Sequence, residues 1–286
     1  MLGKLFKYEF KSTAKVMLTL YAILIVTTLI GTLGLYATVG TANDVFDRSP
    51  LLSLLLITAI IIYILAVFAV FVVTYVYMCT HFYKTMYSAQ GYLTHTLPVN
   101  PLTTFHVKLA TSFVWMFLSV LLLFGSIFLL LTGASHGEIW TELSVEFRTE
   151  ILREFAATGV SIGGFIFEIF VSLVFSCLSY LLWVYASASI GQLFSTNKVT
   201  ASIVAGVVLY FAQQIISLIV MLIFGYFSTT GSTNVFHAVL LEVDFDNTTL
   251  VTNHSLLLTQ NLYTLVIILA LYATCAVIVR KHINLE

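Results

Sequence analysis

Charged residues are scarce in this sequence. Asp, Glu, Lys and Arg together make up 9 % of 286 residues, whereas soluble globular domains carry about 25 %. Because 60 % of the residues are hydrophobic, the composition excludes an ordinary soluble protein and predicts an integral membrane protein. The net charge of −1 gives no reason to expect a nucleic-acid partner.

Cysteine and proline are also rare, with three residues of each type. The cysteines Cys79, Cys177 and Cys275 are widely spaced, which excludes a disulfide framework and the usual metal-ligand spacings. No proline falls inside an apolar run, so the predicted membrane helices are uninterrupted.

Familiar catalytic motifs are absent as well. The sequence contains no Walker phosphate loop, no HExxH and no GxSxG, so we expect no ATP hydrolysis or proteolysis by this chain alone and no cofactor or metal bound to it. His81, His95 and His106 share one polar stretch without an acidic residue. We therefore expect these histidines to be polar surface groups.

Six apolar runs of membrane-spanning length follow one another along the chain. A helix of about 20 residues crosses a hydrocarbon core of about 30 Å, so the expected fold is an all-α single transmembrane domain over residues 1–286. The predicted membrane helices are 16–38, 51–78, 109–132, 161–190, 201–227 and 261–279.

The N-terminal residues 1–15 predict an amphipathic helix at the membrane surface, with lysines toward anionic lipid. A plain basic flank fits the same residues. The apolar run that follows is too long for a signal-peptide core, so we expect an uncleaved first span. The basic residues fall nine on one side of the predicted membrane and three on the other, which places both termini and residues 79–108 in the cytoplasm and residues 133–160 and 228–260 outside.

Polar residues near the outer side and within the spans are candidate functional groups. Residues 137–155 predict an amphipathic helix with an acidic stripe at Glu138, Glu142, Glu146, Glu150 and Glu154; a solvated face and a landing site for a cationic peptide both fit it. Within the spans, Glu168 is a candidate for a substrate route or for packing, because an intramembrane carboxylate costs about 2.5 kcal/mol or more; an acid at the outer interface also fits. Gln213 and Gln214 are candidates for the same route or for interhelical hydrogen bonds.

Small residues four apart mark the fourth and fifth spans, a spacing that permits close backbone approach between helices in lipid. The pairs are Ser187 with Gly191, Ala201 with Ala205, and Ser202 with Gly206.

Residues 79–108, here called the central segment, form the one long polar passage on the predicted cytoplasmic side. The second span would be about 42 Å long at 28 residues, more than the hydrocarbon core requires. The helix is therefore expected to tilt or to project into the central segment. A plain connecting loop and a surface for a soluble partner both fit this passage.

The stretch HFYKTMYSAQGYLTHTLPV resembles the segment between the second and third spans of type 2 ABC transporter permeases, especially compact six-span subunits of Gram-positive bacteria. The opening MLGKLFKYEFKSTAK is similar to the start of that family. One departure is that positions 85–89, often acidic in relatives, are uncharged here. The matched positions are Phe82, Tyr83, Lys84, Ser88, Gly91, Tyr92, Leu93, Thr96, Leu97, Pro98 and Val99.

This resemblance implies a membrane subunit in the bacterial plasma membrane that is powered in trans. Two copies of a separate ATPase would bind ATP and Mg²⁺, and a second permease, identical or paralogous, would complete the transport route. The central segment would contain the coupling helix that docks on the ATPase, and Tyr87 joins the matched residues because its ring suits an interface. The expected coupling residues are Phe82, Tyr83, Lys84, Tyr87, Ser88, Gly91, Tyr92, Leu97 and Pro98.

The cargo stays open between a peptide, a lipid-like molecule and a drug, and the acidic outer residues favour amphipathic cationic peptides, as in self-protection exporters. A non-transporting assembly or sensory subunit held by a cytoplasmic partner is the main alternative. In that case Glu168, Gln213 and Gln214 should be sealed between helices. An ion-coupled carrier fits less well, because such proteins show broken helices or several midplane charges.

Overall fold

The computed structural model describes residues 2–39, 50–88, 90–91, 99–135, 138–146, 149, 152–153, 155, 161–194, 197–228 and 249–281. Over these residues the protein is all-helical, and six of its helices are long and apolar enough to cross a membrane. The predicted all-α membrane fold is thereby confirmed. The helices are α1 (Leu2–Val39), α3 (Pro50–Met86), α5 (Pro101–Ala134), α6 (Glu138–Glu146), α8 (Ile162–Gly191), α9 (Lys198–Ser228) and α11 (Thr249–Lys281).

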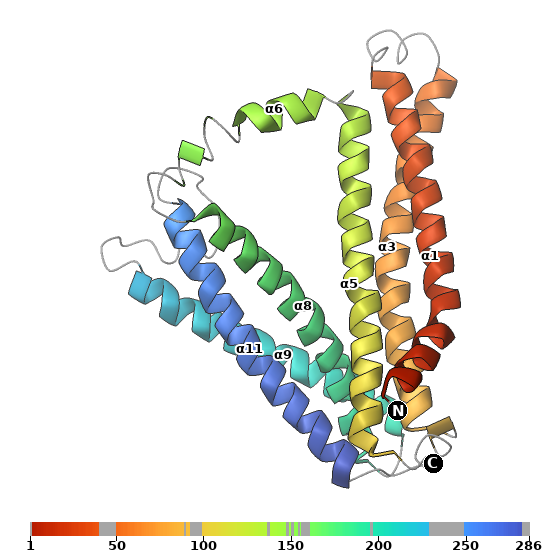
Figure 1. The fold of residues 1–286 in the computed structure, drawn as a ribbon, viewed down its shortest axis with the longest axis vertical. Helices are drawn as coiled ribbons and strands as arrows, with labels where there is room; N and C mark the ends of the chain where they lie inside the picture. Colours follow the sequence, from red (N-terminus) through yellow and green to blue (C-terminus); the bar gives the residue numbers. More distant parts are fainter. Residues whose placement is uncertain are drawn as a thin grey trace. The chain divides into compact units, whose positions relative to one another are not determined.

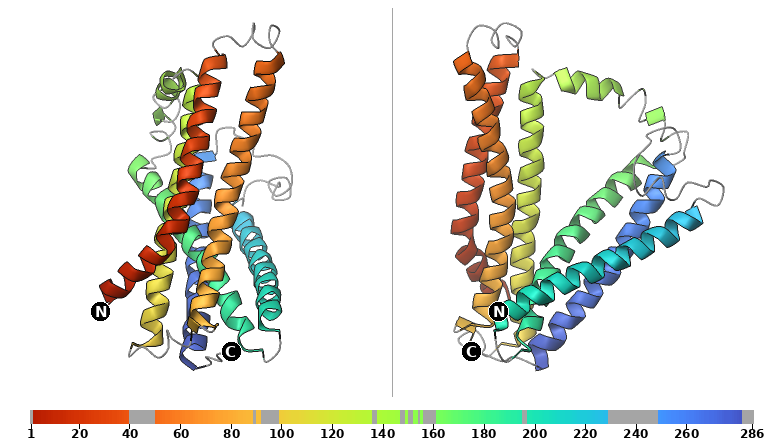
Figure 2. Two further views of the ribbon diagram at one scale, coloured as in Figure 1. Left: turned by 90° about the vertical axis from the view of Figure 1, so that its right-hand side faces the viewer. Right: turned by 180° about the vertical axis from the view of Figure 1, so that it is seen from behind.

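The chain divides into two compact units. Unit 1 comprises Met1–His81 and His106–Ile151, and unit 2 comprises Phe82–Phe105 and Leu152–Glu286. Unit 1 therefore holds α1, most of α3 and most of α5, which run side by side (Figures 1 and 2). Unit 2 holds α8, α9 and α11, together with most of the central segment.

The helices of unit 1 are fastened along their length by hydroxyl groups. The Tyr21 hydroxyl donates to the Trp115 carbonyl oxygen at 2.8 Å and also lies 2.8 Å from the Ser119 hydroxyl. Tyr63 on α3 and Ser126 on α5 are joined by a 2.8 Å hydrogen bond between their hydroxyl groups. Because lipid offers no hydrogen-bond partner, such groups within apolar spans join neighbouring helices.

The N-terminal residues belong to α1 rather than to a helix of their own. They are continuous with the first span, and Figure 2 shows these first turns inclined to the rest of α1. Lys4, Lys7, Lys11 and Lys15 are all exposed, while the predicted apolar residues Leu5, Phe6 and Phe10 are partly buried. The predicted amphipathic division is therefore present, with lysines on the open face; its place at a membrane surface stays a prediction.

In unit 2, α8 packs against both α9 and α11. The predicted close approach of the fourth and fifth spans is confirmed, because a Cβ atom on Gly191 would lie 2.6 Å from the Ser202 backbone nitrogen and one on Gly206 would lie 3.4 Å from the Ser187 Cβ. Asn197, with φ of 54°, directly precedes α9, and its carbonyl accepts from the Ala201 N–H at 2.9 Å. Asparagine tolerates this left-handed conformation better than most residues.

Candidate functional site

The central segment is largely helical at both ends. Helix α3 continues to Met86, eight residues past the predicted end of the second span, so the expected projection is present. Helix α5 begins at Pro101 rather than at residue 109. The reason is a local start signal: the Asn100 side-chain oxygen accepts from the Leu102 N–H at 3.0 Å, and proline suits the first position of a helix.

Short hydrogen bonds to backbone carbonyls hold the residues that follow α3. The Tyr87 N–H donates to the Tyr83 carbonyl at 2.9 Å, the Gly91 N–H donates to the Ser88 carbonyl at 2.6 Å, and the Ser88 hydroxyl donates to the Lys84 carbonyl at 2.6 Å. The predicted coupling residues Tyr92, Leu97 and Pro98 lie outside the described residues.

Within unit 2, aromatic rings hold both ends of the central segment. Phe82 stacks on Tyr185 of α8 with ring centroids 3.7 Å apart and planes within 9°. Phe105 contacts the edges of the same two rings at about 6.2 Å, and Phe82 also meets the Tyr87 ring edge-on at 5.8 Å. These four residues, Phe82, Tyr87, Phe105 and Tyr185, are here called the aromatic anchor, and all are at most 1 % exposed.

A buried hydrogen bond completes the aromatic anchor. The Tyr87 and Ser189 hydroxyl oxygens lie 2.7 Å apart, and the Ser189 hydroxyl also lies 2.7 Å from the Tyr185 carbonyl. Since a carbonyl only accepts, Ser189 gives its proton to Tyr185 and Tyr87 donates to Ser189. Burial raises the pKa of the Tyr87 phenol, which keeps it protonated as this donor.

The expected coupling residues therefore divide into two groups. Phe82, Tyr87 and Gly91 are buried inside the chain, so any part they play in coupling is to hold the segment. Lys84 is exposed, and Tyr83 and Ser88 are partly exposed. Those three are the described coupling residues that a partner could touch.

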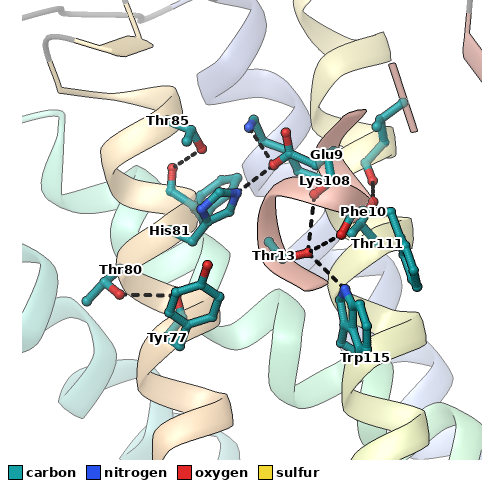
Figure 3. Close-up of polar contacts among 12 residues, drawn as sticks. Glu9, Phe10, Thr13, Tyr77, Thr80, His81, Thr85, Lys108, Thr111 and Trp115 are labelled. Atoms are coloured by element: carbon teal, nitrogen blue, oxygen red, sulfur yellow. Dashed lines mark hydrogen bonds and ion pairs between the residues drawn. The ribbon is translucent and has the colours of Figure 1, made fainter. Parts of the chain in front are cut away.

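Within unit 1, charged groups gather where α3 and α5 meet the first turns of α1. Figure 3 shows the Glu9 carboxylate between His81 and Lys108: its Oε1 accepts from His81 Nε2 at 2.7 Å and from Lys108 Nζ at 2.9 Å. These three residues are here called the Glu9 clip. Lys108 is 5 % exposed, so its ammonium group needs the carboxylate to offset the loss of water.

Trp115 of α5 holds the same turns of α1. Its indole Nε1 donates to the Thr13 hydroxyl at 2.8 Å, and its ring stacks on Phe10 with centroids 4.4 Å apart (Figure 3). Because Phe10 and Thr13 follow Glu9 by one and four residues, the indole and the Glu9 clip hold the same short stretch of helix.

The Glu9 clip corrects one expectation from the sequence. His81 was expected to be a surface group because the central segment contains no acid, but Glu9 pairs with it from 72 residues away. The signal that could have found this pair is that Glu9 is the one acidic residue among four lysines in the first fifteen positions. His106 is exposed, as expected, and His95 lies outside the described residues.

The polar candidates of the later spans do not share one environment. Glu168, near the start of α8, is 5 % exposed, and the alternatives of a substrate route, packing and an outer interface stay predictions. Gln213 is half-buried and Gln214 is exposed in the middle of α9. The Tyr263 hydroxyl of α11 donates to the backbone carbonyl of Gln213 at 2.8 Å, so this contact leaves the glutamine side chain unused.

The structure describes the first half of the predicted acidic helix as α6, and of residues 147–155 it describes 149, 152, 153 and 155, all of them helical. Helix α6 ends at Glu146; its glutamates Glu138, Glu142 and Glu146 are exposed and none of its residues is buried. Trp140 touches Phe128 of α5 edge-on, with ring centroids 4.7 Å apart. Glu150 and Glu154 lie outside the described residues.

Comparison with known proteins finds no matching family model, no matching curated protein and no matching solved structure. The functional interpretation therefore depends on the motif in the central segment and on the geometry described above.

Proposed function

We propose that this chain is the membrane-spanning permease subunit of an ATP-driven ABC exporter, powered by a separate ATPase that docks on the central segment. The observation that carries this proposal is the run of motif matches from Phe82 to Val99. Six helices able to cross a membrane support a permease. On this proposal ATP and Mg²⁺ bind in two copies of the partner, and a second permease, identical or paralogous, pairs with this chain.

The geometry supports two roles within the central segment, one for its buried side chains and one for its exposed side chains. The aromatic anchor holds Phe82 and Tyr87 at buried positions, while Tyr83, Lys84 and Ser88 on the same turns are open to a partner. A docking surface that transmits motion must be firmly attached to the helices it moves. The central segment meets that requirement because it is continuous with α3 and packed on α8.

The proposed cargo is inferred from the exposed acidic groups of α6, which we propose face the outside of the cell. Exposed glutamates beside the exposed side chains of Trp140 and Leu143 suit an amphipathic cationic peptide better than an anionic lipid, because opposite charges attract at short range. We therefore propose that the chain exports such peptides and in this way protects the cell against them.

The test is affinity purification from the native host in mild detergent, with mass spectrometry and an ATPase assay of the eluate. We expect a nucleotide-binding subunit to co-purify with the wild-type chain. The double variant Tyr83→Ala with Lys84→Glu should lose it. The matched control is Lys11→Glu, a lysine on α1 that is also exposed, which should retain it. An intact, folded chain that brings no ATPase would contradict the proposal.

A second candidate is a non-transporting assembly or sensory subunit, which the burial of Glu168 favours and the exposure of Gln214 opposes. It predicts that Glu168→Gln leaves peptide resistance of the host unchanged. The exporter predicts a loss of resistance if Glu168 lines the route. Growth in graded concentrations of a cationic peptide distinguishes the two.

A further inference from the structure

One carboxylate oxygen joins three helices of unit 1. Both His81 Nε2 and Lys108 Nζ are within 2.9 Å of the same atom, Glu9 Oε1. His81 lies on α3, Lys108 on α5 and Glu9 on α1. Figure 3 shows these side chains converging from the three ribbons. A shift of any one helix along its axis would stretch at least one of these bonds.

The two partners of Glu9 stand at special places along the chain. His81 is the last residue of α3 that belongs to unit 1, and Lys108 comes two residues after unit 1 resumes at His106. Together they bracket residues 82–107, which are nearly the whole central segment. Glu9 therefore closes the base of that segment although it is itself outside it.

The burial of the clip separates it from an ordinary surface ion pair. The Glu9 and His81 side chains are 19 % and 16 % exposed, and that of Lys108 is 5 % exposed. Exposed pairs contribute little because water and salt screen them, whereas removing one member of a buried pair leaves the other charge without compensation. The position of Glu9 is also fixed by the contacts of Thr13 and Phe10 with Trp115.

We propose that Glu9 is a positioning residue that sets the separation of α3 and α5 at the two ends of the central segment. Through this separation the N-terminal turns of α1 decide how the docking surface is presented. The first statement concerns unit 1 alone. The second rests on the proposed function, because it requires an ATPase on the central segment.

The first statement is tested by electron paramagnetic resonance with two spin labels on unit 1. The labels are attached to cysteines introduced at Thr80 and Ala110, both exposed, in a background in which Cys79, Cys177 and Cys275 are alanine. The chain is reconstituted without a partner. In Glu9→Gln we expect the distance distribution to broaden at least two-fold. The control Glu142→Gln, an exposed acid of α6, should leave it unchanged.

Two further variants keep the test decisive if Glu9→Gln folds poorly. His81→Ala removes one bond but keeps the Glu9 pair with Lys108, so we expect a smaller broadening. The exchange of Glu9→Lys with Lys108→Glu restores opposite charges and should return the distribution toward that of the wild type. An unchanged distribution in both Glu9→Gln and His81→Ala overturns the proposal.

The second statement is tested by measuring how far this chain stimulates ATP hydrolysis by the partner ATPase in the co-purified complex. We expect Glu9→Gln to lower the stimulation of ATP hydrolysis several-fold and the charge exchange to restore it. The amount of bound ATPase should stay unchanged in both variants. A broadened distance with normal stimulation would keep Glu9 as the residue that sets the helix separation and would reject its control of docking. Loss of the ATPase from the wild-type chain would instead reject the proposed function, and the label distances would still decide the role of Glu9.

Discussion

The Glu9 clip and the aromatic anchor hold neighbouring residues by opposite chemistry. His81 is fixed in unit 1 by a charge-assisted bond, and Phe82, the next residue, is fixed in unit 2 by a ring stacked at 3.7 Å. Charge pairs are directional and fail when either member is removed. Ring packing is spread over many contacts and tolerates changes that keep the volume. The two fastenings should therefore respond differently to matched mutations.

The largest effect is expected from the aromatic anchor. Phe82→Ala removes a ring that is 0 % exposed and should destabilise the chain by about 4 kcal/mol, whereas Phe82→Leu, which keeps more of the volume, should cost about 1.5 kcal/mol. Equilibrium unfolding in mixed detergent micelles, followed by tryptophan fluorescence, measures both. Equal losses in the two variants would show that ring volume is not what holds this site.

The Glu9 clip should come next. Glu9→Ala leaves the buried Lys108 ammonium without its carboxylate and should cost about 3 kcal/mol, while the double variant Glu9→Gln with Lys108→Met, which removes both charges, should stay within about 1 kcal/mol of the wild type. The same unfolding assay applies. If the double variant loses as much as the single one, the clip acts by packing and the contrast with the aromatic anchor disappears.

Close glycine contacts allow unit 1 and unit 2 to be compared without changing a charge or an aromatic ring. A Cβ on Gly133 would lie 2.8 Å from the Thr32 carbonyl oxygen in unit 1, and one on Gly191 would lie 2.6 Å from the Ser202 nitrogen in unit 2. Alanine at either position should cost about 2 kcal/mol by overpacking against backbone.

Gly125 provides the control for these substitutions. A Cβ there would meet nothing within 4 Å, so Gly125→Ala should stabilise α5 by up to about 1 kcal/mol through helix propensity. If alanine lowers the free energy of unfolding equally at all three glycines, the assigned contacts are wrong.

The smallest effect is expected from the hydroxyl within the aromatic anchor. Tyr87→Phe keeps the ring and removes only the donor to Ser189, which keeps its own bond to Tyr185, so the loss should be about 1 kcal/mol. The control Tyr83→Phe alters a partly exposed ring on the same turn and should change stability by less than about 0.5 kcal/mol. A Tyr87→Phe loss as large as that of Phe82→Ala would mean that the hydrogen bond, rather than the rings, is the main fastening.

The sequence predicted the membrane helices well because their signal is local. Hydropathy alone located six spans, and small residues four apart located the contact of Gly191 with Ser202. The helix ends were less accurate, because Asn100 and Pro101 begin α5 within a stretch that reads as a polar connection.

The Glu9 clip and the aromatic anchor could not be predicted from a local signal in the sequence. Glu9 and His81 are 72 residues apart, and Tyr87 and Ser189 are 102 apart, so no periodicity joins them. Phe82 and Tyr87 belong to a motif stretch that suggested an exposed interface, yet packing places them inside. A sequence motif indicates which residues matter to a segment, and only the fold shows which of them face inward.

The hydrogen bond between Tyr63 and Ser126 gives α3 a mechanical property of its own. It fastens the helix 13 residues from Pro50 and 18 residues from His81, which corresponds to arms of about 20 Å and about 27 Å. Toward His81 the helix is also held by packing, because Val70, Thr74 and Met78 are each 1 % exposed, whereas Leu54, Ile57 and Ile61 toward Pro50 are at least 50 % exposed. In mechanical terms α3 is a beam clamped from Tyr63 to His81, and within this chain its freedom to bend lies in the about 20 Å before Tyr63.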